Sequence, residues 1–108
     1  MKIKDFKAHY KDYFPVSEGW RTLVEKLVDD IIKINPEIEV MQVKEKFGGL
    51  RFYTGGIDSD YADKIYDLIE KADAESFKIC ENCGTREDVI TKGDWLLTLC
   101  DNCRKERK

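Results

Sequence analysis

Four cysteines near the end of the chain are the residues whose types and spacing most clearly predict chemistry. They form one C-x2-C pair, Cys80 and Cys83, and a second pair, Cys100 and Cys103, with sixteen residues between the pairs. Two intervening residues let both sulfurs of a pair reach one ion, and two pairs complete a tetrahedral set of thiolates. The pattern predicts one structural Zn²⁺, and because four thiolates leave no open coordination position, it argues against a catalytic metal.

Two other uses of these cysteines predict different settings. Disulfides need an oxidising compartment, whereas the first residues, MKIKDFKAHYKDYF, lack the apolar stretch of a secretory signal. A thioredoxin-type redox pair needs a βαβ setting and would explain only one of the two pairs. No apolar run is long enough to span a membrane. We therefore expect a cytoplasmic protein with a metal rather than disulfides.

The residues around the cysteines predict how the second pair returns to the first. TREDVITKGDWLLTL, between the pairs, has the composition of two short strands joined by a turn at 92–94. CDNCRKERK then predicts one or two helical turns, whose start would carry Cys100 and Cys103 and favour their thiolates. This order of knuckle, hairpin and helix, over residues 78–108, resembles a treble-clef or zinc-ribbon finger.

Residues 1–77 predict a core of helix, helix, hairpin and helix. The four-residue spacing of Phe6, Tyr10 and Phe14 predicts a short amphipathic helix that Pro15 stops. Ser17 is positioned to cap a second helix, and the Asn-Pro pair at residues 35–36 should end that helix. A third helix follows an acidic start and runs to about Ser76. Its inward-facing residues should be Tyr61, Ile65, Leu68, Ile69 and Ala72.

The stretch KEKFGGLRFYTGG predicts the turn of a β-hairpin over residues 38–54 and leaves two registers open. A two-residue Gly-Gly turn would oppose Lys46 to Arg51 and gather positive charge on one face, which would suit an anionic partner. A three-residue turn would oppose Glu45 to Arg51 and cancel that charge in an ion pair. In the first register the buried face comprises Val43, Phe47, Leu50 and Phe52, and the other face carries Lys44, Lys46, Arg51 and Tyr53.

Together these elements predict an α+β fold in which a β-hairpin packs with helices and a C-terminal four-cysteine zinc finger follows. Residues 1–77 and 78–108 should form one structural domain, with Phe77, Ile79 and Trp95 fastening the finger to the core. A two-stranded hairpin has open edges, so a homodimer is a credible state.

Charge and composition favour a binding protein over an enzyme. The net charge of −3 argues against sequence-independent coating of nucleic acid. We expect a non-enzymatic module with a protein partner and no membrane partner. The candidate contact residues are Lys44, Lys46, Arg51, Tyr53 and Arg104. The alternative is a DNA- or RNA-binding zinc-finger protein, in which these residues and the basic tail 104–108 gather on one face.

Several stretches resemble small proteins encoded by bacteriophages and prophages. They are GW before the second helix, VKEKFGGLRFY, AES at the end of the third helix, CENCG and W..TLCDNC, which together span most of residues 19–103. The resemblance implies a phage or prophage origin, a bacterial cytoplasm as the setting, and a role in host takeover or against host defence. It also implies that Cys80, Cys83, Cys100 and Cys103 are metal ligands, but no particular biochemical activity.

Overall fold

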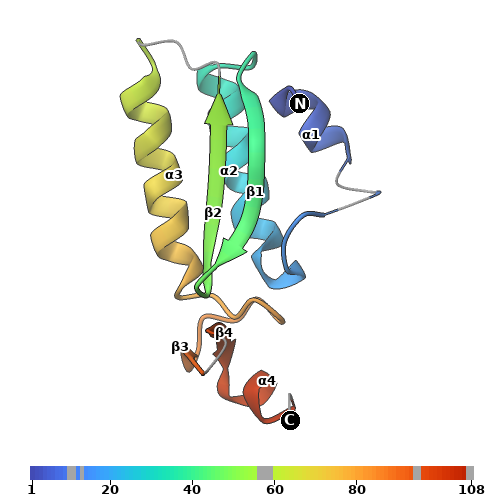
Figure 1. Cartoon of the computed structure of the whole chain (residues 1–108), viewed down its shortest axis with the longest axis vertical. Coiled ribbons are helices and arrows are strands. Elements are labelled where there is room, and N and C mark those ends of the chain that lie inside the picture. Colours follow the sequence, from blue (N-terminus) through green and yellow to red (C-terminus); the bar gives the residue numbers. More distant parts are fainter. Residues whose placement is uncertain (10–11, 13, 56–59, 94–95, 107–108) are drawn as a thin grey trace.

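The computed structural model describes residues 1–9, 12, 14–55, 60–93 and 96–106, and these form an α+β fold as the sequence predicts. A core of helices and a long hairpin occupies one end, and the smaller cysteine-bearing finger occupies the other (Figure 1). Each of the two sheets is an antiparallel pair of strands. In chain order the elements are α1 (Ile3–Ala8), the 3₁₀ helix η2 (Glu18–Trp20), α2 (Arg21–Ile34), β1 (Glu39–Lys46), β2 (Gly49–Gly55), α3 (Ala62–Ser76), β3 (Val89–Lys92), β4 (Leu97–Cys100) and α4 (Asp101–Glu106).

The hydrophobic core lies between the β1–β2 hairpin and two long helices. α2 runs behind the hairpin and α3 runs beside β2 (Figure 1). Each helix buries residues spaced by three and four, which is the period of one helix face. The buried residues are Val24, Leu27, Val28 and Ile31 of α2, Ile65, Ile69 and Ala72 of α3, and Val40, Leu50 and Phe52 of the hairpin. Burying a large aliphatic or aromatic side chain contributes about 1.5 to 3 kcal/mol, so this cluster holds the core together.

The amino-terminal residues cover one edge of β1. The Ile3 amide donates to the Ile38 carbonyl at 2.9 Å, and the Val40 amide donates to the Met1 carbonyl at 2.7 Å. α1 ends at Ala8, so the prediction of a helix that continues to Phe14 is wrong; Tyr10 lies outside the described residues. Phe6 and Phe14, whose spacing suggested one helix, instead make two separate contacts with the core. The Phe6 ring meets Phe52 edge-on at 6.1 Å, and the Phe14 ring lies 4.3 Å from the Arg21 guanidinium carbon.

The helices α2 and α3 end where the sequence predicts, but two residues near their starts, Ser17 and Tyr61, differ from the prediction. α2 ends at Ile34 because Asn35, before the proline, is extended. Ser17 precedes η2 but makes no side-chain cap, and its carbonyl accepts the Trp20 amide at 3.0 Å instead. Tyr61 is 42% exposed just before α3 and not inward-facing.

The hairpin adopts neither of the two registers considered from the sequence. Its two-residue turn is Phe47-Gly48, with φ angles of 56° and 84°, the signature of a type I′ turn. Lys46 therefore pairs with Gly49, and Lys44 pairs with Arg51. Phe47 is 65% exposed, so its predicted place on the buried face is wrong.

Contacts at the tip explain why this register is chosen. The Glu45 carboxylate accepts a hydrogen bond from the Gly48 amide at 2.6 Å. The glutamate is therefore bonded within the turn and does not pair with Arg51. A Cβ at Gly48 would lie 2.6 Å from Thr91 Cγ2, so only glycine fits where the tip meets the finger. The Ser76 hydroxyl accepts the outward-pointing Leu50 amide at 2.9 Å, which joins the end of α3 to β2.

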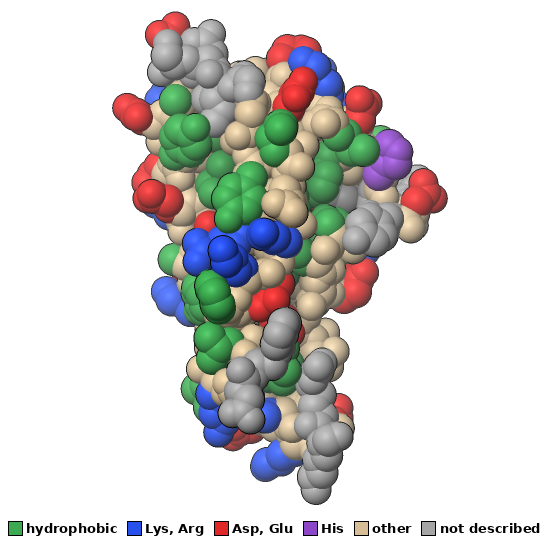
Figure 2. Space-filling view, viewed as in Figure 1, with side chains coloured by type: hydrophobic (Ala, Val, Ile, Leu, Met, Phe, Trp, Pro, Cys, Tyr) green, Lys and Arg blue, Asp and Glu red, His purple; other side chains and the backbone are tan. Residues whose placement is uncertain are grey.

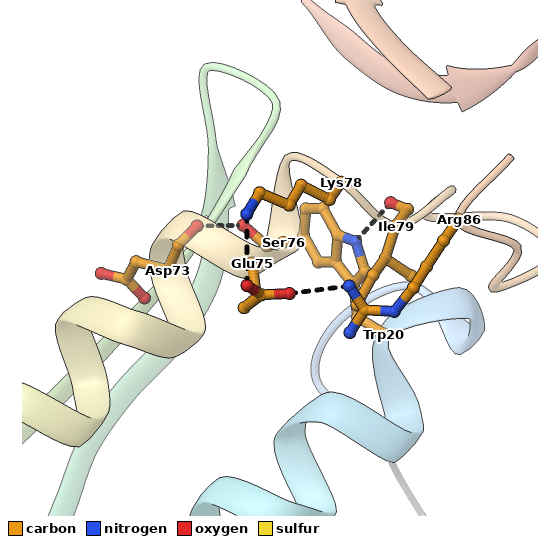
Figure 3. Close-up of polar contacts among 7 residues, drawn as sticks. All are labelled: Trp20, Asp73, Glu75, Ser76, Lys78, Ile79 and Arg86. Carbon is orange, nitrogen blue, oxygen red and sulfur yellow. Dashed lines mark hydrogen bonds and ion pairs between the residues drawn. The ribbon is translucent and has the colours of Figure 1, made fainter. Parts of the chain in front are cut away.

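The 3₁₀ helix η2, which leads into α2, fastens the core to the first cysteine pair. The Gly19 amide donates to the Glu81 carbonyl at 2.8 Å, and the Trp20 indole donates to the Ile79 carbonyl at 3.0 Å (Figure 3). Beside this contact, Glu75 of α3 pairs with Arg86 at 2.7 Å (Figure 3). A Cβ at Gly19 would lie 2.1 Å from the Cys80 carbonyl oxygen, so the glycine lets the two backbones approach.

We expect Gly19→Ala to lower the free energy of unfolding by about 1 to 3 kcal/mol, because the added methyl group must push the two backbones apart. Gly55→Ala is the matched control, since among the described residues its Cβ would meet only the flexible Met41 side chain, at 3.1 Å. Urea unfolding of both variants measures the difference. Equal stability of Gly19→Ala and Gly55→Ala would contradict the close contact.

Candidate metal centre

The fold brings all four cysteine sulfurs together. Each Sγ atom lies within 4.8 Å of the other three, and Cys83 Sγ and Cys100 Sγ are 3.8 Å apart. A tetrahedron with metal–sulfur bonds of about 2.3 Å has edges of about 3.8 Å. The sulfur positions therefore fit a tetrahedral ion, and these four cysteines could hold a metal.

A tight knuckle shapes the first pair. The Cys83 amide points at Cys80 Sγ at 3.5 Å, and the Gly84 amide donates to the Cys80 carbonyl at 2.9 Å. Gly84 has a φ of 85°, a conformation that glycine adopts without strain. The Cys80 amide donates to the Thr85 carbonyl at 2.8 Å and closes the loop. The sequence C-x2-C-G thus folds locally into a surface for one ion.

The second pair lies where β4 meets α4. Cys100 is the last residue of β4, and Cys103 lies in the first turn of α4, as the sequence predicts. The Cys103 amide points at Cys100 Sγ at 3.5 Å, and the Asn82 side-chain amide donates to Cys103 Sγ at 3.3 Å. Since Asn82 belongs to the first knuckle, this last bond ties one pair to the other.

The Arg104 side chain holds parts of the finger together. Its guanidinium donates to the carbonyls of Ile90 at 2.6 Å, Leu97 at 3.1 Å and Lys92 at 3.4 Å. These bonds fasten α4 to both strands of the second hairpin. The sequence offered Arg104 as a residue for partner contact, but the structure engages its guanidinium within the fold.

The close spacing of the four thiols favours a bound cation on electrostatic grounds. Burial works against the Cys80 thiolate, but the amides of Cys83 and Asn82 outweigh it and lower the pKa of Cys80 to about 6. The Asn82 amide favours the Cys103 thiolate, yet the neighbouring sulfur of Cys100 and burial raise the pKa of Cys103 to about 12. Four thiolates at such distances repel one another, so only a bound cation lets all four ionise.

The finger also contacts the tip of the β1–β2 hairpin. The Thr98 hydroxyl donates to the Gly48 carbonyl, and the Glu81 amide donates to the Thr98 carbonyl at 2.9 Å. A Cβ at Gly49 would lie 2.3 Å from the Phe77 ring, which packs over this glycine. Ile79 is buried, whereas Trp95, the third expected contact, lies outside the described residues. Sequence reasoning missed Thr98; its only signal was a hydroxyl between two apolar residues of a short strand.

The other four candidate residues, Lys44, Lys46, Arg51 and Tyr53, share the outer face of the β1–β2 hairpin. Lys44 and Arg51 are directly paired, and Tyr53 lies on the same face with the Lys44 ammonium 5.9 Å from its ring centre. Lys46 follows along β1, and its ammonium lies 5.5 Å from the Phe47 ring centre. Figure 2 shows the resulting group of basic side chains, with hydrophobic side chains above and below it. Among the described residues, no ion pair joins Lys44, Lys46 or Arg51 to a carboxylate.

Asp73 of α3 gives Arg51 partial electrostatic balance. Burial raises the pKa of Asp73 to about 6, and the charge of Arg51 acts in the opposite direction. One carboxylate oxygen, Oδ1, is buried without a hydrogen-bond partner among the described residues. The acid therefore influences Arg51 through space but does not bind it.

Comparison with protein-family models, with curated proteins and with solved structures found no match to this chain. Within the described residues, none of the helices combines the length and apolar character needed to cross a bilayer.

We expect binding of a divalent ion to release at least two protons at neutral pH, one each from Cys83 and Cys103, because the pKa of each of these thiols is raised. Protons and metal compete for the same sulfurs, so affinity should fall as the pH falls. Calorimetric titration of metal-free protein with Co²⁺ in two buffers of different protonation enthalpy counts the protons. The double variant Cys80→Ser/Cys83→Ser is the control and should bind no ion tightly. Uptake without proton release would contradict the thiol site.

Proposed function

We propose that the protein is a non-enzymatic binding module, stabilised by one structural Zn²⁺, that recognises a protein partner through the outer face of the β1–β2 hairpin. Cys80, Cys83, Cys100 and Cys103 hold the ion. Zinc suits this site because it accepts a tetrahedral set of thiolates without a redox change. With four sulfur ligands the ion has no position for water or substrate, so its contribution is folding free energy.

The observation that supports a contact surface is the cluster of Lys44, Lys46 and Arg51. Directly paired like charges destabilise an antiparallel sheet, yet Lys44 faces Arg51 across the two strands. No carboxylate forms an ion pair with either residue within the part of the chain that the structure describes. Carboxylates of a partner would supply the missing negative charge.

A protein suits this surface better than a nucleic acid. The cations are few, the net charge is −3, and the acid Asp73 stands beside Arg51. Arg104 is engaged with carbonyls of its own finger and adds little to a basic face. Nucleic acid is the second candidate because three cations and Tyr53 share one face, an arrangement that single strands use for backbone and base contacts.

The biological setting of the proposal comes from the sequence resemblance alone. The resemblance suggests that a phage or prophage encodes the protein, and that the protein acts in the cytoplasm of a bacterial host on a host or phage protein. Host takeover and resistance to host defence are the roles that the resemblance suggests. A homodimer is less well supported, because Met1 and Ser76 each occupy a backbone position on one hairpin edge.

We expect the triple variant Lys44→Gln/Lys46→Gln/Arg51→Gln to fail to capture the protein that the unaltered chain captures from bacterial lysate. The reason is that the substitutions remove the three positive charges that would face the partner. The control removes three exposed cations from the helices, Lys4→Gln/Lys33→Gln/Lys64→Gln, and should capture normally. Quantitative mass spectrometry compares the captured proteins. Equal capture by both variants would refute the surface, and retention of nucleic acid with a steep salt dependence would favour the second candidate.

A further inference from the structure

Phe47 has a backbone conformation that its side chain disfavours. It is the first residue of the type I′ turn and has a φ of 56°, in the left-handed region. Bulky residues are rare there, and turns of this type strongly favour Asn-Gly. Phe47 therefore makes the hairpin harder to form than an asparagine would.

Among the described residues, packing does not compensate for this strain. The side chain of Phe47 is 65% exposed, and the ring contact that the structure shows is with the Lys46 ammonium, 5.5 Å from the ring centre. An exposed aromatic ring contributes little to a core. Strained residues that serve neither backbone geometry nor packing are found at functional sites, so the conformation itself points to a role in binding.

The tip that carries Phe47 is held rigidly. Gly48 contacts Thr91, and the Thr98 hydroxyl binds the Gly48 carbonyl. A ring on a fixed turn loses little conformational freedom on binding. Two more partly exposed apolar residues lie beside the tip: Phe77, 40% exposed, packs over Gly49, and Leu96, 38% exposed, has its carbonyl near Gly48.

We propose that Phe47 is the anchor of the contact surface: its ring enters an apolar pocket on the partner protein, and carboxylates at the rim of that pocket pair with Lys44, Lys46 and Arg51. This inference rests on the proposed protein-binding function and adds the chemistry of the partner. Aromatic anchors surrounded by charged groups dominate the affinity of many protein interfaces. Nucleic-acid stacking is less favoured because lysine ammonium groups already lie over the rings of Phe47 and Tyr53.

The substitution Phe47→Asn separates a binding role from a structural one, because the two roles predict opposite changes in stability. Asparagine suits the first position of this turn, so we expect the melting temperature to rise by about 4 °C or more. If Phe47 instead supports the fold, the melting temperature falls and the inference is overturned. Tyr66→Asn is the control, since Tyr66 is 52% exposed on α3 and should show no such rise.

The second measurement is the affinity of the same variants for the protein that the unaltered chain captures. Phe47→Asn should weaken binding by about thirtyfold or more. Phe47→Tyr, which keeps the ring, and Tyr66→Asn should bind normally. Photo-crosslinking through p-benzoylphenylalanine in place of Phe47 should map to an apolar partner segment flanked by Asp or Glu.

The outcomes distinguish the anchor from the wider proposal. If Phe47→Asn binds normally while Lys44→Gln/Lys46→Gln/Arg51→Gln does not, the protein-binding function stands and the anchor is refuted. A crosslink to nucleic acid, or to a partner segment without acids, also overturns the inference. If no captured protein depends on either set of residues, both proposals fail.

Discussion

The convergence of four sulfurs on one point is the constraint on which the rest of the structure depends. The described part of residues 80–106 forms two short strands and one short helix, too little to bury a core of its own. A structural zinc ion contributes about 10 to 16 kcal/mol in isolated finger peptides, which is comparable to the net stability of a whole domain. The ion would therefore decide whether this segment has a defined shape. The bonds from Asn82 and Arg104 then refine that shape but do not create it.

The same constraint extends into the core through short backbone contacts. Next to Cys80, the carbonyls of Ile79 and Glu81 accept hydrogen bonds from Trp20 and Gly19 of η2. From β4, Thr98 reaches the carbonyl of Gly48 at the tip of the other hairpin. The finger that carries the four cysteines thus positions the turn that contains Phe47, although none of these cysteines belongs to that turn. If the proposed binding face and the proposed ion are both present, metal content would be coupled to function.

The sequence predicts the elements well and their junctions poorly. Cysteine spacing predicts the clustering of the four sulfurs because the geometry is local to each C-x2-C pair, and apolar periodicity predicts α2 and α3 for the same reason. The hairpin register could not be predicted, because it depends on Thr91 and Thr98, which are far away in the sequence, and on an aromatic residue in a position that turn chemistry disfavours. Gly19 drew attention only as part of a GW motif, and its close approach to Cys80 emerges from the fold. Arg104 looked like a surface charge because nothing local reveals the carbonyls that it binds.

The most direct test of the central claim is X-ray absorption at the zinc edge of the protein as purified from zinc-supplemented cells. The account predicts a first shell of four sulfur atoms at about 2.3 Å, with one zinc ion per chain. A shell that contains nitrogen or oxygen ligands, or protein that carries no zinc and has disulfide-bonded cysteines, would contradict it.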